Sequence, residues 1–367
     1  MKIALYNLTT TTAYGGVESF VWDLANQLAQ RHHDVHVFGG RGERREGNAG
    51  VQVHTFPFID RARFSWIPGL RRAYAERKLL ERLSMAVAAL PALIAGHYDI
   101  IHIQKPYDLL PALIAGRLSG AKVILGCHGE DFYRGDRWLA SRVDGAVSCS
   151  RFNATTVMQR YPINIEVVYN GINTTVFAPP ATPTPAAPTL RLLFVGRLQP
   201  WKGVDTAIHA LAELPNATLT IAGDGVHRAQ LTALVNTLTL QERVTFLGSV
   251  ERRHIPALMH RHDVLVATSH ASETFGIGLV EAQACGLPVV ASRFGGFVEV
   301  VNDGHTGLFF APRDPHDLAQ TLRYIDTHRE HLAVMAHAAP AWAAQFAWPR
   351  VTDHIESYYH QITERRG

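Results

Sequence analysis

Apolar and polar positions form two kinds of pattern along this chain, one typical of helices and one typical of strands. In residues 17–31, VESFVWDLANQLAQR, apolar side chains return every three or four positions, which predicts a helix with one buried face. Short apolar runs between such segments are typical of buried strands. In the first half of the chain these runs are KIALY, DVHVF, DIIHI, KVILG and GAVSC. Strands that alternate with helices predict a parallel sheet covered by helices on both faces.

The same alternation of predicted strands and helices begins again after a proline-rich segment. Residues 178–190, APPATPTPAAPTL, contain five prolines, and proline supplies no amide proton to a helix or a sheet. Beyond it, the expected strands are RLLFVG, ATLTIAG, RVTFLG, DVLVAT, PVVAS and GLFF. We therefore expect an α/β fold with two Rossmann-like, parallel-sheet domains, residues 1–177 and 191–346, joined by a hinge at 178–190. Such domains would present the carboxyl ends of both sheets to one cleft, where ligands bind.

The composition of the chain excludes several classes of protein. Of the 367 residues, 47% are hydrophobic and 18% charged, so the chain can bury cores for two domains. A net charge of +3 without a long basic run does not indicate a nucleic-acid partner. Three scattered cysteines are not a disulfide framework, and the N-terminal MKIALYNLTT is not a signal peptide. The longest apolar segment, residues 85–95, is too short to span a bilayer, so we expect a soluble cytoplasmic protein.

Two loops that follow predicted strands carry glycines suited to phosphate binding. Gly15 and Gly16 precede the first helix, whose N-terminus offers amides and a partial positive charge. In VGRLQPWKG, Arg197 and Lys202 stand between a strand and a helix, where they would suit a diphosphate. Taken alone, each pattern is explained as well by a plain tight turn or by solvated loop charges.

His128 follows another strand end, in the motif HGED. There it could hydrogen-bond a substrate hydroxyl or act as an acid or base, although most of the 20 histidines must be structural. Cys127 is set aside as a nucleophile because neighbours in a strand point to opposite faces. The sequence has no HExxH motif and no Cys/His cluster, so we expect no metal site and no cofactor.

Two glutamates in ETFGIGLVEAQACGLPVVASRFGG stand among small and apolar residues. A helix is expected to begin near Gly276 and to end at Cys285–Gly286, which places Glu273 before it and Glu281 inside it. Eight helical residues span about 12 Å, more than the roughly 5–9.5 Å between the carboxyl groups of a glycosidase. The two carboxylates would instead hold two parts of one long ligand. The amides that would face a phosphate between them belong to Phe275, Gly276, Ile277 and Gly278. The alternative for Glu281 is a surface charge on a helix.

Together these motifs resemble the family-4 retaining glycosyltransferases, which have the two-domain GT-B fold. The resemblance spans nearly the whole chain and includes GGVESFVWDLANQLAQRHHDVHVF, HGED, NGINTTVF, VGRLQPWKG, AGDGVHRAQL, VTFLGSV and SETFGIGLVEAQACGLPVVASRFGGFVEVVNDGHTGLFF. It implies transfer of a sugar from a nucleotide-sugar, with UDP-sugar favoured over GDP-sugar, to a glycan, lipid-linked or small-molecule acceptor. Synthesis of cell-envelope polysaccharide or glycoconjugate is the implied setting.

The resemblance also implies a role for each candidate residue of the second domain. Glu273 would contact the hydroxyls of the donor sugar, and Glu281 would hold the ribose. Arg197 and Lys202 would bind the diphosphate and stabilise its charge as it leaves. The amides of residues 275–278 would meet the sugar and the phosphates.

For the first domain the resemblance implies contacts with the other side of the donor. Gly15 and Gly16 would close on the phosphate, and His128 would lie against the donor sugar near the acceptor. The last helix, residues 347–367, would pack back on this domain.

Because no nucleophile is evident, we expect a front-face displacement in which the departing phosphate takes the acceptor's proton. An alternative is another enzyme on the same fold, such as a sugar-nucleotide epimerase or a phosphorylase. Product analysis without acceptor separates the epimerase from a transferase. A further alternative is a non-catalytic subunit that binds a nucleotide-sugar, which only a turnover assay excludes.

Residues 61–82, RARFSWIPGLRRAYAERKLLER, contain seven basic and two acidic residues together with Phe64 and Trp66. A basic and aromatic stretch of this kind could rest on an anionic membrane and reach a lipid-linked acceptor. A peripheral location at the inner face of the membrane would follow. The alternative is a solvated helix face.

Overall fold

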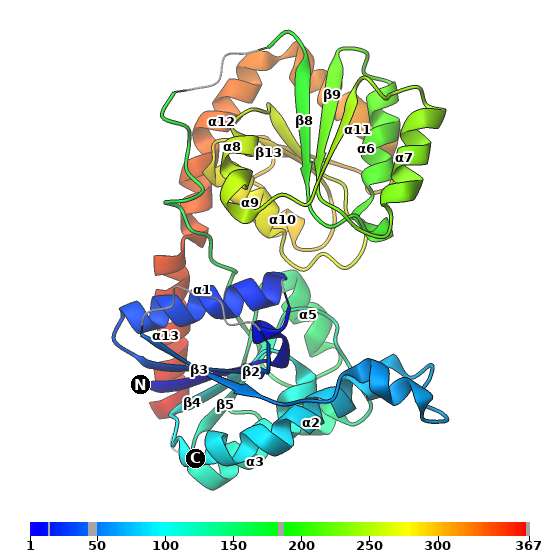
Figure 1. The fold of residues 1–367 in the computed structure, drawn as a ribbon. Coiled ribbons are helices and arrows are strands. Elements are labelled where there is room, and N and C mark those ends of the chain that lie inside the picture. Colours follow the sequence, from blue (N-terminus) through cyan, green and yellow to red (C-terminus); the bar gives the residue numbers. More distant parts are fainter. Residues whose placement is uncertain (14, 43–49, 183–186, 365–367) are drawn as a thin grey trace. The chain divides into compact units, whose positions relative to one another are not determined.

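The computed structural model describes residues 1–13, 15–42, 50–182 and 187–364 (Figure 1). Their contacts form two compact units. The first unit contains residues 1–171 together with 348–367, and the second contains residues 172–347.

The first unit is built on a seven-stranded parallel sheet. In spatial order its strands are β3 (Val51–Phe56), β2 (Asp34–Gly40), β1 (Lys2–Tyr6), β4 (Ile100–Ile103), β5 (Lys122–Cys127), β6 (Gly145–Ser148) and β7 (Glu166–Val167). Its helices are α1 (Gly16–Gln30), α2 (Tyr74–Ala95), α3 (Leu109–Ser119), α4 (Asp136–Ala140), α5 (Arg151–Met158) and α13 (Trp348–Glu364). Short 3-10 helices are η1 (Leu8–Thr11), η2 (Arg61–Trp66) and η3 (Pro106–Asp108). The helical pattern of residues 17–31 forms α1, whose buried side chains include Phe20, Val21, Leu24 and Leu28.

The second unit is also built on a parallel sheet, which has six strands. In spatial order its strands are β10 (Val244–Gly248), β9 (Ala217–Ala222), β8 (Leu190–Val195), β11 (Val264–Ala267), β12 (Val289–Ser292) and β13 (Gly307–Phe310). Its helices are α6 (Val204–Ala212), α7 (Arg228–Thr237), α8 (Ile255–Met259), α9 (Ile277–Ala284), α10 (Phe297–Val300), α11 (Pro315–Thr327) and α12 (Arg329–Ala343). Its 3-10 helices are η4 (Pro200–Lys202), η5 (Arg252–His254) and η6 (Ala344–Phe346). Two parallel-sheet α/β domains are therefore confirmed.

Helix α13 belongs to the first unit, although it is the last element of the chain. The Tyr358 hydroxyl donates to the Ala146 carbonyl at 3.2 Å, and the Tyr359 hydroxyl lies 2.7 Å from Nδ1 of His102 in β4. The Trp348 ring fills the space beside Gly171, where an added Cβ would lie 2.3 Å from the indole. Residues 365–367 of the predicted helical segment lie outside the described residues.

The boundary between the units falls earlier than the predicted hinge. Ile172 forms a β-bridge with Ala347, and the buried Phe177 ring lies 5.5 Å from the Arg252 guanidinium. Because residues 172–178 already pack within the second unit, the chain crosses at residues 171 and 172 and returns at 347 and 348. Segment 178–190 lies beyond this crossing, and its residues 183–186 are not among those described.

The parallel pairing of the strands determines where the loops that carry candidate functional residues lie. Among the described residues, the strand pairs within the two sheets are parallel, so within each sheet the carboxyl ends of the strands lie along one edge. Loops that follow neighbouring strands are therefore brought side by side, however far apart they are in sequence. The candidate residues of each unit follow such strand ends.

Candidate functional site

In the second unit, Lys202 and Glu273 form an ion pair. Lys202 ends η4 after β8, and Glu273 follows β11, which pairs directly with β8 in the sheet. The Lys202 Nζ atom lies 2.6 Å from Oε2 of Glu273, and the Ser269 hydroxyl donates to the same oxygen at 3.0 Å. The side chains are 26% and 13% exposed, so each charge is partly withdrawn from water. Two residues predicted for different parts of a donor thus meet directly.

A glycine turn holds Lys202 in this place. Gly203 has a φ of +63°, and an added Cβ would lie 2.3 Å from the Thr268 carbonyl oxygen. The Thr268 hydroxyl donates to the Lys202 carbonyl at 2.7 Å, and the His270 amide donates to the Trp201 carbonyl at 2.9 Å. Only a residue without a side chain allows the loop after β8 to pack this closely on the loop after β11.

The helix that follows Glu273 and contains Glu281 has the predicted limits. Gly276 is the N-cap of α9 with a φ of +93°, and a Cβ there would collide with the Phe297 ring at 2.6 Å. No side chain caps this helix start, and the helix ends at Cys285 as its C-cap. The N-terminus of α9, with the backbone of residues 275–278, therefore offers the positive end of a helix dipole.

Glu281 has a partner that the sequence reading missed. Its side chain on α9 is only 10% exposed, and Oε1 lies 2.6 Å from Nη2 of Arg252. Arg252 follows β10 in the motif GSVERR, so its place after a predicted strand was the available signal. The surface-charge alternative for Glu281 does not hold, because the residue is buried and paired.

The remaining predicted cation, Arg197, lies apart from these pairs. It follows β8 by two residues and is exposed. Within the described part of the chain the structure gives it no ion pair. Its guanidinium therefore remains available to an anion at this edge of the sheet.

In the first unit, Gly15 and Gly16 lie at the start of α1, as predicted. Gly15 is the N-cap with extended backbone, so its conformation does not require glycine. An added Cβ at Gly15 would lie 2.4 Å from Oε2 of Glu18, the end of a flexible side chain that would have to move, whereas Gly16 has nothing within 4 Å. Thr9 donates to the other Glu18 oxygen at 2.5 Å, which anchors the turn before α1.

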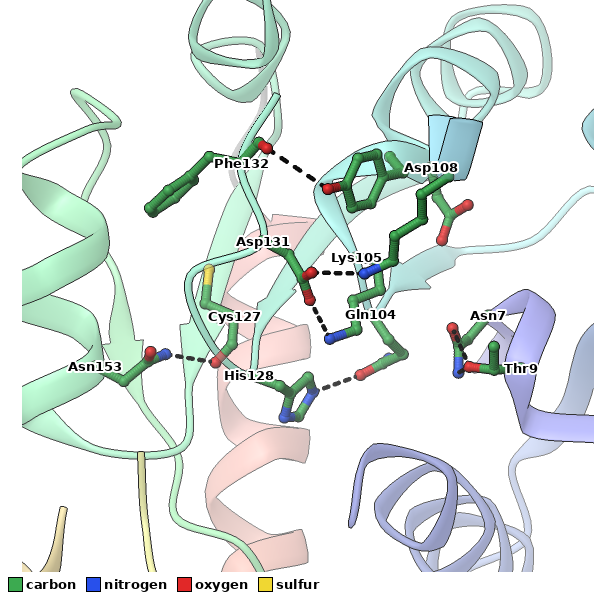
Figure 2. A network of polar contacts seen from close by, with 12 residues as sticks. Asn7, Thr9, Gln104, Lys105, Asp108, Cys127, His128, Asp131, Phe132 and Asn153 are labelled. Carbon is green, nitrogen blue, oxygen red and sulfur yellow. Dashed lines mark hydrogen bonds and ion pairs between the residues drawn. The ribbon is translucent and has the colours of Figure 1, made fainter. Parts of the chain in front are cut away.

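His128 lies after β5 with one ring nitrogen engaged. Its Nε2 lies 2.8 Å from Oε1 of Gln104, which follows β4 (Figure 2). The Gln104 amide donates from Nε2 to the His102 carbonyl at 3.3 Å, so its carbonyl oxygen must face His128 and accept. The proton of His128 is thereby placed on Nε2, which leaves Nδ1 as an acceptor.

His128 is also held uncharged. Burial is the main cause that lowers its pKa to about 3, and the charge of Lys105 and the proximity of His102 lower it further. The ring of Phe20 packs against it with the centroids 4.9 Å apart. At neutral pH this side chain can accept a hydrogen bond from a hydroxyl, but it is not a proton donor of the imidazolium type.

The neighbouring Cys127 has no features of a nucleophile. It is buried, and burial raises the pKa of its thiol to about 12. Among the described residues no group of three or more His, Cys, Asp or Glu side chains is arranged to hold a metal ion.

Solved structures with the same fold place the chain in a class. Anabaena HepE in complex with UDP superposes with a TM-score of 0.80 at 24% identity, over 98% of this chain and 100% of that one. Sucrose-phosphate synthase from Thermosynechococcus elongatus gives a TM-score of 0.84 at 20% identity, over 98% of each chain. The fold is GT-B, the two-domain fold of many glycosyltransferases.

Sequence comparison then gives the family. The family described as Glycosyltransferase Family 4 matches residues 14–176, and Glycosyl transferases group 1 matches residues 184–342. Glycogen synthase of Mycobacterium tuberculosis is 30% identical over 96% of this chain and 92% of its own length. D-inositol 3-phosphate glycosyltransferase of Mycolicibacterium smegmatis is 37% identical over 96% and 88%. The chain belongs to the family-4 glycosyltransferases and is a glycosyltransferase enzyme.

Gln104 provides a test of the protonation state of His128. We expect Gln104→Glu to raise the pKa of His128, because a carboxylate facing Nε2 stabilises the imidazolium. The ring then loses its acceptor nitrogen at low pH, so kcat/KM falls about tenfold or more below neutrality and recovers as the pH rises. Gln104→Leu, which adds no charge, lowers kcat/KM at all pH values without a new ionisation.

The wild type is expected to show no ionisation of His128 between about pH 5 and 8, given its lowered pKa. Nitrogen-15 NMR of the imidazole rings reports the tautomer directly, and thermal melts verify that both variants fold. A Gln104→Glu profile that matches the wild type would overturn this account of the histidine.

Proposed function

We propose that this glycosyltransferase moves a sugar from a UDP-sugar to an acceptor hydroxyl with retention of the anomeric configuration and without a metal ion. The observation that carries the proposal is the Lys202–Glu273 pair beside the uncapped N-terminus of α9. Cation, carboxylate and helix amides meet at one sheet edge, and these are the groups that a sugar diphosphate requires. Anabaena HepE, which has the same fold, is described in complexes with UDP and with UDP-glucose.

The second unit would hold the donor in two parts. Arg197, Lys202 and the backbone of residues 275–278 would surround the diphosphate, where their positive charge and dipoles stabilise the leaving group. Glu273 would accept hydrogen bonds from the sugar hydroxyls, and Glu281 from the ribose. Arg252, which already contacts Glu281, would keep that carboxylate oriented.

The reaction is proposed as a front-face displacement. The bond between the anomeric carbon and the diphosphate oxygen lengthens, and the electron pair moves to the diphosphate while the sugar develops oxocarbenium character. The acceptor oxygen then forms its bond on the same face and transfers its proton to the departing phosphate oxygen. Catalysis would come mainly from positioning and from stabilisation of the diphosphate charge.

His128 would bind the donor sugar and would not take part in the proton transfer. Its free Nδ1 would accept a hydrogen bond from a hydroxyl of the donor sugar, since the ring is neutral and its other nitrogen is engaged by Gln104. Gly15 and Gly16 would let the start of α1 approach a phosphate, where the helix amides carry partial positive charge.

The acceptor would be a hydroxyl of a polyol or glycan. The two relatives named above differ in this respect, since one is named as a glycogen synthase and the other as acting on inositol 3-phosphate. One is a glycosyltransferase by name and the other is named as a synthase of a glycan, which favours transfer over epimerisation for this chain. Synthesis of a glycoconjugate or polysaccharide remains our proposal for its setting.

Substitutions in the second unit separate the proposed roles. A hydrogen bond to a charged group contributes about 1.5–3 kcal/mol, so Lys202→Met and Arg197→Met should each reduce kcat/KM roughly 10- to 150-fold. We expect Glu273→Gln to lower kcat with little effect on nucleotide affinity. Glu281→Ala should raise the KM for donor and weaken UDP binding. The assay follows UDP release from UDP-glucose together with isothermal titration of UDP.

Arg323→Met is the matched control, because Arg323 is an exposed cation of the same unit on α11, and it should leave both constants unchanged. Unchanged rates in Lys202→Met and Arg197→Met would remove the diphosphate assignment. A Glu273 variant that loses nucleotide affinity while the Glu281 variant loses kcat would show that the two roles are exchanged.

We further propose that a surface at the start of residues 61–82 rests on an anionic bilayer. The structure reduces the basic stretch predicted there, because Arg82 is buried against Asp108, Arg61 pairs with Glu81, and Lys78 pairs with Asp131. The exposed part of this stretch carries Arg63, Arg71, Arg72 and Trp66, and Ile59 is exposed just before it. Trp66 is 79% exposed, and the segment projects from the sheet of its unit (Figure 1). None of the described helices is long and apolar enough to span a membrane.

Co-sedimentation with vesicles tests this surface. The protein should bind vesicles that contain phosphatidylglycerol more tightly than neutral vesicles, with binding that weakens as salt is added. The double variant Arg71→Ala/Arg72→Ala should reduce binding about 30-fold, since each arginine near such a surface contributes about 1 kcal/mol. Trp66→Ala should also reduce binding, because it removes apolar surface that would enter the interface. Binding that is equal for neutral and anionic vesicles, or unchanged in both variants, would contradict the proposal.

A further inference from the structure

Two lysines of the first unit share a single carboxylate beside His128. Lys78 on α2 lies with Nζ 2.6 Å from Oδ1 of Asp131, and Lys105, which follows β4, contacts Oδ2 of the same residue (Figure 2). The three side chains are 13%, 15% and 27% exposed. A structural ion pair requires only one of these lysines, so the cluster has a surplus positive charge.

Two further carboxylates in the described part of this unit, Asp108 and Glu81, have cations of their own. Asp108 is fully buried against Arg82, and Glu81 is paired with Arg61, so each of these carboxylates is neutralised by its own arginine. Burial lowers the pKa of Lys78, and the charges of Lys105 and Arg82 oppose the stabilising effect of Asp131. Burial by itself would raise the pKa of Asp131, but Lys105 and Lys78 hold it below its usual range, so this carboxylate stays ionised. The cluster thus carries a net charge of +1 in a partly desolvated place, where an added anion gains more than it would in open water.

The cluster lies at the carboxyl ends of the strands, where proteins with parallel α/β sheets bind their ligands. Lys105 follows β4 and Asp131 follows β5, at the carboxyl ends of two adjacent strands. Lys105, Asp131, Gln104 and His128 border the same small cavity. Lys78 is additionally fixed over the Tyr107 ring, 4.8 Å from its centroid. Lys105 and Asp131 are therefore held next to the histidine that we assign to the sugar, and Lys78 joins them through its ion pair with Asp131.

We propose that Lys78 and Lys105 form an anion site that recognises a phosphoryl group on the acceptor. This inference rests on the proposed function, because it names the acceptor of the same reaction as a phosphate ester. A phosphate monoester carries about −1.5 to −2 charges at pH 7, and lysine ammonium groups bind such anions as point charges. A neutral acceptor leaves the surplus charge without a counterion. The Asp131 carboxylate holds the two ammonium groups together and at the same time competes with the incoming phosphate.

This double role of Asp131 gives a sharp test. Inorganic phosphate is titrated into the full-length protein that is already saturated with UDP, so that the donor site cannot bind the added phosphate. Saturable binding is expected in the wild type, measured by isothermal titration and by thermal shift. Lys78→Met and Lys105→Met should each weaken it about tenfold or more. Lys122→Met is the matched control, because Lys122 also pairs with an aspartate in this unit and should bind phosphate like the wild type.

The Asp131→Asn variant separates an anion site from a merely structural network. Removal of the competing negative charge should tighten phosphate binding several-fold, even if the variant melts at a lower temperature. A structural network predicts the lower melting temperature without any gain in phosphate affinity. Absence of saturable phosphate binding in the wild type, or unchanged binding in both lysine variants, overturns the proposal.

Turnover identifies the source of the phosphoryl group. With UDP-glucose as donor, glycerol 3-phosphate is compared with glycerol, and phosphatidic acid vesicles are compared with neutral vesicles, as inhibitors of acceptor-dependent UDP release. Inhibition by the soluble ester that Lys78→Met removes assigns a soluble acceptor, and inhibition by the vesicles alone assigns a lipid headgroup. If neither inhibits, the anion site is not an acceptor site. If UDP itself does not bind, the proposed function fails instead, so the two failures are distinguishable.

Discussion

The contact between Lys202 and Glu273 is the interaction on which the proposed donor site depends. These residues are 71 positions apart, yet their strands are neighbours in a parallel sheet, so the fold places them together before any ligand arrives. Each partly buried charge would be costly without the other. In our proposal the pair keeps a cation ready for the diphosphate and a carboxylate ready for the sugar, and the ligand displaces each partner when it binds.

The charged side chains of the candidate sites are paired differently in the two units. In the second unit each of the two candidate glutamates has its own cation, Lys202 for Glu273 and Arg252 for Glu281. In the first unit the histidine is kept neutral, while two lysines gather on one aspartate. One unit therefore has groups matched to a diphosphate joined to two polyhydroxyl parts, and the other has a hydroxyl-binding imidazole and a surplus positive charge. This difference is what assigns the donor to one unit and the acceptor anion to the other in our proposal.

Much of the fold followed from local sequence signals, whereas the partners of the site residues did not. The limits of α9 were predictable because Gly276, Gly286 and Pro288 act locally, and α1 followed from its apolar period. Arg252 and Gln104 were missed because their roles depend on residues 29 and 24 positions away, which no spacing along the chain reveals. The unit boundary was placed too late for a similar reason, since the packing of residues 172–178 on the second unit is a tertiary contact and proline content marks only the absence of regular structure. The roles assigned to the site residues remain proposals that the variants test.

The central claim is that the second unit binds a nucleoside diphosphate without metal, and thermal stabilisation by UDP, GDP and ADP tests it most directly. Each nucleotide is added at millimolar concentration to the wild type, with EDTA and then with Mg²⁺. A ligand at 100 times its Kd adds about 2.7 kcal/mol, which raises the Tm by several degrees. The account predicts that UDP stabilises the protein more than GDP or ADP does, and equally in EDTA and in Mg²⁺. Stabilisation by none of the three, or only in the presence of Mg²⁺, would contradict it.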